Sequence, residues 1–195
     1  MRTPALAVAL ALVVMPGVPA VAKPVPAPKP QIRDDEADQR GLGPGYDIRS
    51  ALFTTAGTMV RSGKKTTYVP NRLVVAVTYS APPSQDLYAA QVVAFATSSC
   101  RVYLEIYGVD RRTYGSGSCA GSGGFAVPVN VSGNVLTISL PFSALGTSLR
   151  AGVELRELET WTNVAEPTDG YEPGDLAGSA FTVDVASTDV TYTIR

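Results

Sequence analysis

The chain contains no histidine among its 195 residues. Because Ser-His-Asp and Cys-His arrangements need an imidazole to move the proton, this absence excludes both kinds of nucleophilic catalysis. It also excludes the zinc and copper sites that use histidine ligands. Any general base would have to be an aspartate, a glutamate, a lysine or a tyrosine.

Charged residues are also scarce. Asp, Glu, Lys and Arg together make up 17% of the chain, and the formal net charge is −1. A chain without excess positive charge lacks the electrostatic attraction by which proteins bind nucleic acid or anionic membranes. We therefore expect the partner to be neither nucleic acid nor a membrane.

A long apolar run occurs only at the start of the chain. Arg2 precedes the run Ala5–Met15, and Ala20 and Ala22 provide small residues for cleavage. These are the parts of a secretory signal peptide, and the run is too short to cross a membrane with ease. A signal anchor is the alternative. We expect a signal peptide over residues 1–22, cleaved after Ala20 or Ala22, and a secreted mature chain without a membrane span.

The chain has two cysteines, Cys100 and Cys119. In an exported protein such a pair predicts a disulfide. The bond would close a loop of about 20 residues, and by lowering the entropy of the unfolded chain it would stabilise the fold by roughly 3 kcal/mol. Two free thiols are the alternative.

Residues 23–45 are expected to form a flexible leader. Proline alternates with other residues over 23–30, which favours an extended polyproline II spacer. The carboxylates that follow would bind Ca²⁺ only if a loop folded them inward. The simpler interpretation is that they form a solvated stretch of the leader. These carboxylates are Asp34, Asp35, Glu36 and Asp38.

From residue 46 onward the sequence alternates between apolar and polar residues. In the segment 101–107, Val102, Leu104 and Ile106 would point one way and the residues between them the other, which is typical of a strand with one buried face. Turn signals at 62–65 and 132–134 predict tight connections. The other expected strands span 47–55, 59–69, 72–79, 90–97, 125–131, 135–140, 151–164, 180–185 and 189–194.

This pattern predicts one all-β domain over residues 46–195. About eight to ten short strands at regular spacing favour an antiparallel β-sandwich, of jelly-roll or immunoglobulin-like type. A closed barrel is the alternative. The segment 141–146 predicts one short helical turn closed by glycine. The segment 151–164 contains helix formers, but its neighbours favour a strand with a bulge near Arg156.

Aromatic residues are the candidate ligand-binding groups. Tyr103 and Tyr107 lie four residues apart on one expected strand, so they share a face, and Trp161 is the single tryptophan. Together with Tyr114 they could stack against the rings of a carbohydrate. The alternative is that these aromatic side chains only cover the sheet or fill the core.

Asp169, Glu172 and Asp175 could bind Ca²⁺ from one loop. Gly170 and Gly174 would allow the sharp turns that bring carboxylate and carbonyl oxygens together. The spacing does not match an EF-hand, and a solvated loop is the alternative. We expect no other cofactor.

If the protein were an enzyme, its catalytic groups would have to be carboxylates. A pair such as that of a glycosidase could be drawn from Glu105, Glu154, Glu157 and Glu159. These residues are expected on solvated strand faces, so we do not expect an enzyme, and a carboxylate-dependent hydrolase is the less favoured alternative.

The layout also resembles a known group of secreted β-sandwich domains. An acidic leader runs into Asp47-Ile48, the hairpin Val127–Leu140 leads into the motif at 141–146, and an acidic loop follows late in the chain. Over about residues 34–195 this is similar to the DOMON and family 9 carbohydrate-binding modules, which are common in exported bacterial proteins. The resemblance implies a β-sandwich that binds sugar, haem or Ca²⁺. Haem-binding members use histidine and methionine, whereas this chain has no histidine and only Met59 after the signal.

The expected function is therefore an exported, non-catalytic binding domain. Its ligand would be a carbohydrate or another extracellular molecule. The alternative is a structural or interaction protein of the cell envelope without a small-molecule site.

Overall fold

The computed structural model describes residues 28–34, 42–84, 89–107, 113–117, 126–146, 149–165 and 180–195. Residues 113–117, 165, 180, 181 and 183 are described by their backbone alone. The expected signal peptide and the expected calcium loop with Asp169, Glu172 and Asp175 lie outside the described residues. Across the part of the chain that is described, no helix has the length and hydropathy to cross a membrane.

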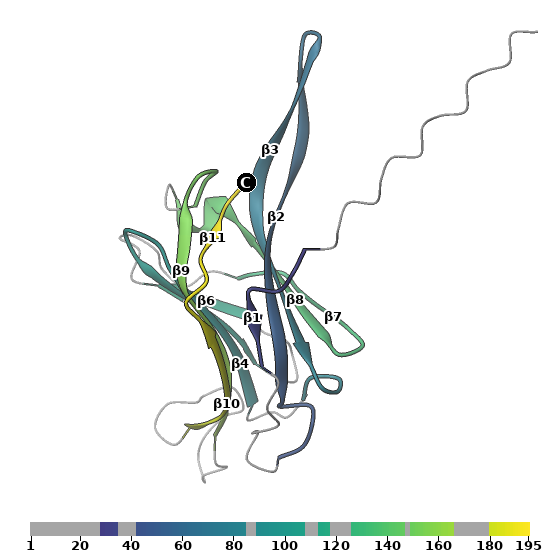
Figure 1. The fold of residues 1–195 in the computed structure, drawn as a ribbon, viewed down its shortest axis with the longest axis vertical. Helices are drawn as coiled ribbons and strands as arrows, with labels where there is room; N and C mark the ends of the chain where they lie inside the picture. The colour runs from purple at the N-terminus through teal and green to yellow at the C-terminus, as the bar shows by residue number, and fades with distance from the viewer. Residues whose placement is uncertain are drawn as a thin grey trace, which may run out of the picture.

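The described strands form two antiparallel sheets that face each other, which confirms the predicted all-β sandwich (Figure 1). The first sheet has the order β1-β2-β3-β8-β7 and the second the order β10-β9-β4-β5-β6, with β11 paired to β9. The first sheet comprises β1 (Ile32–Arg33), β2 (Ile48–Ser62), β3 (Lys65–Tyr79), β8 (Val135–Pro141) and β7 (Val129–Ser132). The second comprises β10 (Ala180–Thr188), β9 (Glu154–Ala165), β4 (Ala89–Ala96), β5 (Arg101–Tyr107), β6 (Thr113–Gly117) and β11 (Tyr192–Thr193).

The core lies between the sheets and follows the period-two pattern of the sequence. Val102, Leu104 and Ile106 of β5 are buried, as their alternation predicts. The first sheet supplies Leu73 and Val75 of β3 to the same core cluster. Each such side chain contributes roughly 1.5–3 kcal/mol when it is fully buried, so this interface is the main source of stability.

The tight connections occur where they were predicted. Gly63 has φ 60° in the turn between β2 and β3, and Gly133 has φ 57° in the turn between β7 and β8. Only glycine adopts this backbone conformation without cost, which fixes both hairpin registers. The predicted helical turn is the 3₁₀ helix η1 (Phe142–Leu145), which buries its two terminal side chains.

The predicted bulge in β9 is also confirmed. Leu155 and Leu158 are both buried although they lie three positions apart, which a regular strand does not permit because its side chains alternate between the two faces. Glu157 lies between them with φ 49°, and the register against β4 shifts at this point. The extra residue therefore turns both leucines toward the core.

Part of the expected flexible leader is instead built into the sheet. Ile32 is fully buried and pairs with Ala51 of β2. The carboxamide of Gln31 accepts a hydrogen bond from the amide of Phe53 at 2.7 Å and donates one to its carbonyl at 3.2 Å. One apolar residue among polar neighbours carries no periodic signal, so the sequence pattern did not predict β1.

The hairpin of β2 and β3 extends beyond the sandwich as a two-stranded arm, here defined as residues 57–71 (Figure 1). Most of its side chains are exposed, and the exposed fraction of Met59 is 66%. The arm begins at a bulge, because Ala56 pairs with Arg72 but Gly57 pairs with Pro70. A Cβ atom on Gly57 would lie 2.2 Å from the Val69 carbonyl oxygen, so this joint requires glycine.

Candidate functional site

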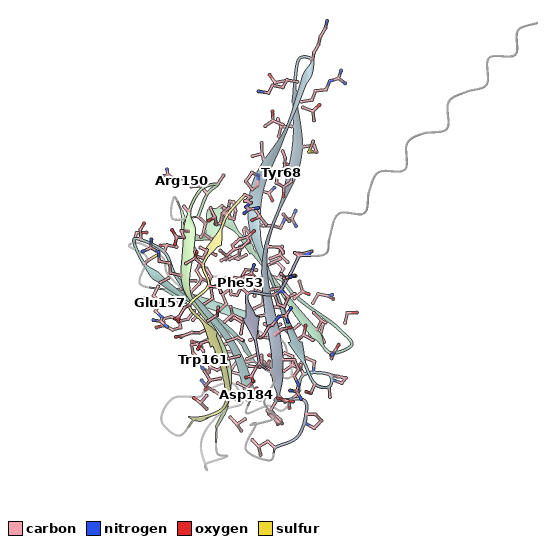
Figure 2. The ribbon with its side chains drawn as sticks, in the orientation of Figure 1. Phe53, Tyr68, Arg150, Glu157, Trp161 and Asp184 are labelled. Atoms are coloured by element: carbon pink, nitrogen blue, oxygen red, sulfur yellow. The ribbon has the colours of Figure 1, made fainter. Side chains whose placement is uncertain are left out.

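The second sheet brings three of the four predicted aromatic residues onto its outer face. Tyr103 and Tyr107 project from β5 and Trp161 from β9, on either side of the central strand β4. Figure 2 shows Trp161 along β9. Tyr114 pairs with Glu105 through its backbone, and its side chain lies outside the described residues.

Small residues on β4 form the floor of this face. Ala90, Val92 and Ala94 lie in register between the outward residues of β5 and β9, and all three are buried. Because these side chains are short, rings from the two neighbouring strands can lean over β4 and meet. We call these outward residues of β5, β4 and β9 the aromatic face.

Tyr103 and Trp161 meet across β4. Their ring centroids are 6.3 Å apart, and the ring planes make an angle of 77°, which is an edge-to-face contact. Tyr103 lies in the row of Ala94 and Trp161 in the row of Val92, so the contact is a diagonal one. Both side chains keep part of their surface exposed.

Charged groups surround the aromatic pair. The guanidinium of Arg101 lies 5.6 Å from the centre of the Tyr103 ring, within the range of a cation–π interaction. It also donates to Glu157 at 2.7 Å and to Glu159 at 2.6 Å. One guanidinium thus fixes the position of an aromatic ring and of two carboxylates.

A second polar pair lies further along β5. The Tyr107 hydroxyl donates to a carboxylate oxygen of Glu105 at 2.6 Å. The aromatic face therefore presents ring surfaces beside carboxylate, hydroxyl and guanidinium groups. This is the set of groups that orients a polyhydroxylated ligand, since rings contact C–H groups and the polar groups bind hydroxyls.

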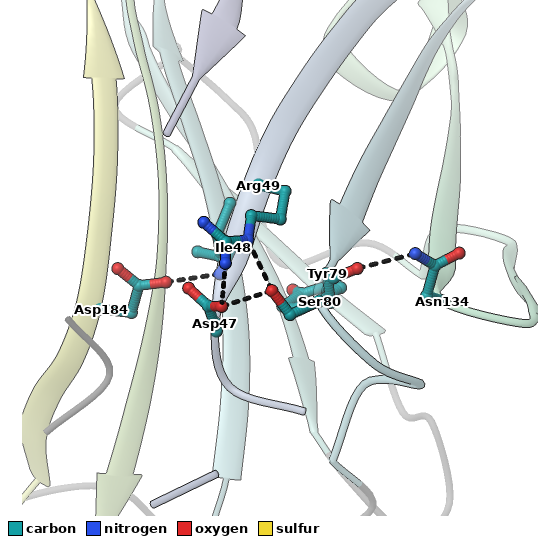
Figure 3. Close-up of polar contacts among 7 residues, drawn as sticks. All are labelled: Asp47, Ile48, Arg49, Tyr79, Ser80, Asn134 and Asp184. Carbon is teal, nitrogen blue, oxygen red and sulfur yellow. Dashed lines mark hydrogen bonds and ion pairs between the residues drawn. The ribbon is translucent and has the colours of Figure 1, made fainter. Parts of the chain in front are cut away.

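A buried polar cluster at the start of β2 was not predicted (Figure 3). Asp47 and Asp184 are 2% and 3% exposed. The Ile48 amide donates to Asp184 at 2.5 Å, and Asp47 accepts from the Ser80 hydroxyl and forms an ion pair with Arg49 at 3.2 Å. These contacts join β2, the end of β3 and β10, so the cluster fastens the two sheets together.

Tyr79 lies beside this cluster. Burial raises the pKa of its hydroxyl, the negative charge of Asp184 raises it further, and the nearby side chain of Thr162 acts in the opposite direction. The backbone of Tyr79 exchanges bonds with Asn134, whose side-chain amide donates to its carbonyl at 2.7 Å. Tyr79 thus links the cluster to the turn between β7 and β8.

The other predicted sites are only partly visible. Cys100 is buried at the start of β5, and its expected disulfide partner Cys119 lies outside the described residues, so that bond stays a prediction. Among the residues that the structure describes, no three Asp, Glu or Cys side chains gather as a metal site. The Ca²⁺ loop also stays a prediction.

Comparisons of the chain with family models, with curated proteins and with solved structures find no match. The resemblance to the DOMON and family 9 carbohydrate-binding modules therefore stays a prediction. Function has to be inferred from the residues themselves.

Proposed function

We propose that the protein is an exported, non-catalytic domain that binds an extracellular carbohydrate on the aromatic face. The observation that carries this proposal is the Tyr103–Trp161 pair, held over a floor of small residues and beside Arg101. Its export is inferred from the signal peptide expected over residues 1–22.

The charges on the aromatic face support binding rather than catalysis. Arg101 forms ion pairs with Glu157 and Glu159, and Glu105 accepts a hydrogen bond from Tyr107. These contacts hold the carboxylates in position and engage part of each group, while the remaining lone pairs can accept hydrogen bonds from sugar hydroxyls.

The proposal is tested by titrating the protein with a panel of soluble polysaccharides while the emission of Trp161, the single tryptophan, is recorded. A ligand on the aromatic face is expected to shift this emission in a saturable way. Calorimetry then compares Trp161→Ala and Tyr103→Ala with Tyr68→Ala, an exposed aromatic residue on the arm. We expect at least about tenfold weaker binding for the first two variants, about 1.4 kcal/mol, and no change for the control.

Binding that survives both substitutions on the aromatic face would contradict the proposal, as would an emission that no glycan changes. A second function, that of an interaction protein of the cell envelope, is favoured by the exposed arm. This function uses a surface separate from the aromatic face.

A further inference from the structure

The outer edge of β2 exposes the backbone groups of alternate residues. Near the sandwich these groups have partners: the Asp34 amide donates to the Arg49 carbonyl at 3.0 Å, Ala51 pairs with β1, and the Gln31 carboxamide bonds both groups of Phe53. Odd-numbered residues of β2 therefore direct their N–H and C=O groups away from β3.

The same edge continues into the arm without a neighbouring strand among the described residues. In a hairpin with a two-residue turn, the closing pair is hydrogen-bonded, and here that pair is Ser62 and Lys65. Counting back from this pair again places the backbone groups of Arg61, Met59 and Gly57 outward. Both parts of β2 thus direct the backbone groups of odd-numbered residues to the same edge, which β1 and Gln31 cover near the sandwich and which is open along the arm.

The other edge of the arm is interrupted. The same count directs Thr66, Tyr68 and Pro70 of β3 outward, and proline has no N–H to donate. Proline on an edge strand is a common way to prevent pairing with another chain. The arm therefore has one blocked edge, on β3, and one open edge, on β2.

The side chains of the arm do not suit a membrane surface. Elements that lie on a membrane carry their apolar residues on one face. Here Met59 and Tyr68 share one face while Val60 and Val69 lie on the other, and all four are exposed. A two-stranded ribbon with apolar groups on both faces is marginal in water by itself, so it gains most from additional strands.

We propose that two copies of this chain pair through the β2 edges of their arms. A two-fold axis at Met59 pairs Met59 with Met59 of the second copy, and Gly57 with Arg61 of the second copy. All of these residues have outward backbone groups, so each pair forms the hydrogen bonds of an antiparallel ladder. The contact uses the same surface on both copies and closes as a dimer.

The side chains agree with this register. Tyr68 is the partner of Met59 within the arm, so the dimer aligns two tyrosines and two methionines in one row across four strands. Such cross-strand apolar neighbours stabilise a sheet. Arg61 lies opposite a glycine, which avoids the repulsion between like charges that directly opposite arginines would cause.

Sedimentation equilibrium of the full protein over a range of concentrations tests the proposal. We expect twice the mass of the chain at high concentration. Met59→Pro removes an outward N–H from the open edge, and Thr66→Pro removes one from the blocked edge, so neither variant removes a hydrogen bond between β2 and β3. Met59→Pro should raise the dissociation constant at least about tenfold and Thr66→Pro should leave it unchanged.

Cross-linking tests the register without proline. Met59→Cys should form a disulfide-linked dimer under mild oxidation, because the paired Cα atoms would lie about 5.5 Å apart. Thr66→Cys should not. The proposal is overturned by a protein that stays monomeric at every concentration, by equal effects of the two prolines, or by cross-linking at position 66 instead of 59. Binding of the monomer to anionic vesicles through the arm would overturn it in favour of a membrane.

Discussion

Asp184 of β10 accepts a hydrogen bond at 2.5 Å from the amide of Ile48, which lies 136 residues earlier at the start of β2. The bond passes from one sheet of the sandwich to the other. Because both groups are buried, loss of the carboxylate leaves an amide without a partner, which costs about 1–3 kcal/mol. We expect Asp184→Ala to lower the free energy of unfolding by this amount in urea titrations.

Asp184→Asn provides the control for that measurement. The asparagine side chain keeps an oxygen that can accept the Ile48 amide, so it should recover most of the lost stability. Equal losses for alanine and asparagine would show that the charge of Asp184, and not this hydrogen bond, is responsible.

The buried Tyr79 hydroxyl predicts a loss of stability at high pH. Its pKa is raised in the folded protein by burial and by Asp184, whereas an unfolded tyrosine ionises near pH 10. Above about pH 10 the unfolded chain therefore loses a proton that the folded chain retains, and stability falls by up to about 1.4 kcal/mol per pH unit.

Urea titrations between about pH 9 and pH 11.5 check this expectation. Tyr79→Phe should remove part of the alkaline slope, while the same substitution at Tyr68 on the exposed arm should leave it unchanged. An unaltered slope in Tyr79→Phe would show that other groups cause the alkaline loss.

The sequence predicted the sandwich because its buried strands alternate regularly. Val102, Leu104 and Ile106 gave a clear inward face, and the glycines of the two tight turns marked the hairpins. Exposed strands have no such constraint. The arm was expected only as the short segment 59–69 with a turn at 62–65, because both of its faces are exposed and no period of two is imposed on it.

Contacts between distant strands were the part that sequence could not supply. The spacing of Tyr103 and Tyr107 placed both on one face, but their relation to Trp161 depends on β9 pairing with β4. The contact between Asp184 and Ile48 depends on the packing of β10 against β2. Neither follows from local periodicity, because the strand order decides both.

Arg101 and Glu159 should be energetically coupled. Their atoms approach to 2.6 Å, and both side chains are about one-third exposed. At such exposure a pair contributes about 0.2–1 kcal/mol. A double-mutant cycle with Arg101→Ala and Glu159→Gln, measured by urea unfolding, should give a coupling energy in this range. The corresponding cycle between Arg156 and Glu159 serves as a control and should give a value near zero.

The predicted disulfide between Cys100 and Cys119 has a direct test. The bond would close a loop of about 20 residues, and reduction should lower the free energy of unfolding by roughly 3 kcal/mol. Mass spectrometry after alkylation without reductant should find no labelled cysteine. The Cys100→Ser, Cys119→Ser double variant should reproduce the reduced protein and should not respond to reductant. Labelling of both cysteines in the untreated protein would contradict the prediction.

Gly57 should control the shape of the arm. A Cβ atom at this position would lie 2.2 Å from the Val69 carbonyl oxygen and 2.7 Å from the Pro70 Cα, and both of these are backbone atoms that cannot move aside alone. Gly57→Ala therefore has to separate the strands at the bulge, at a cost of about 1–3 kcal/mol. Measured by hydrogen exchange, Gly57→Ala should exchange the amides of the arm faster than the unmodified protein does, while the amides of the core strands should exchange as before. Thr58→Ala, at the exposed neighbouring position, should change neither the stability nor the exchange. If Gly57→Ala left the arm amides as protected as before, the strands would have to accommodate the methyl group without separating, and the close approach at Gly57 would not be what sets the joint.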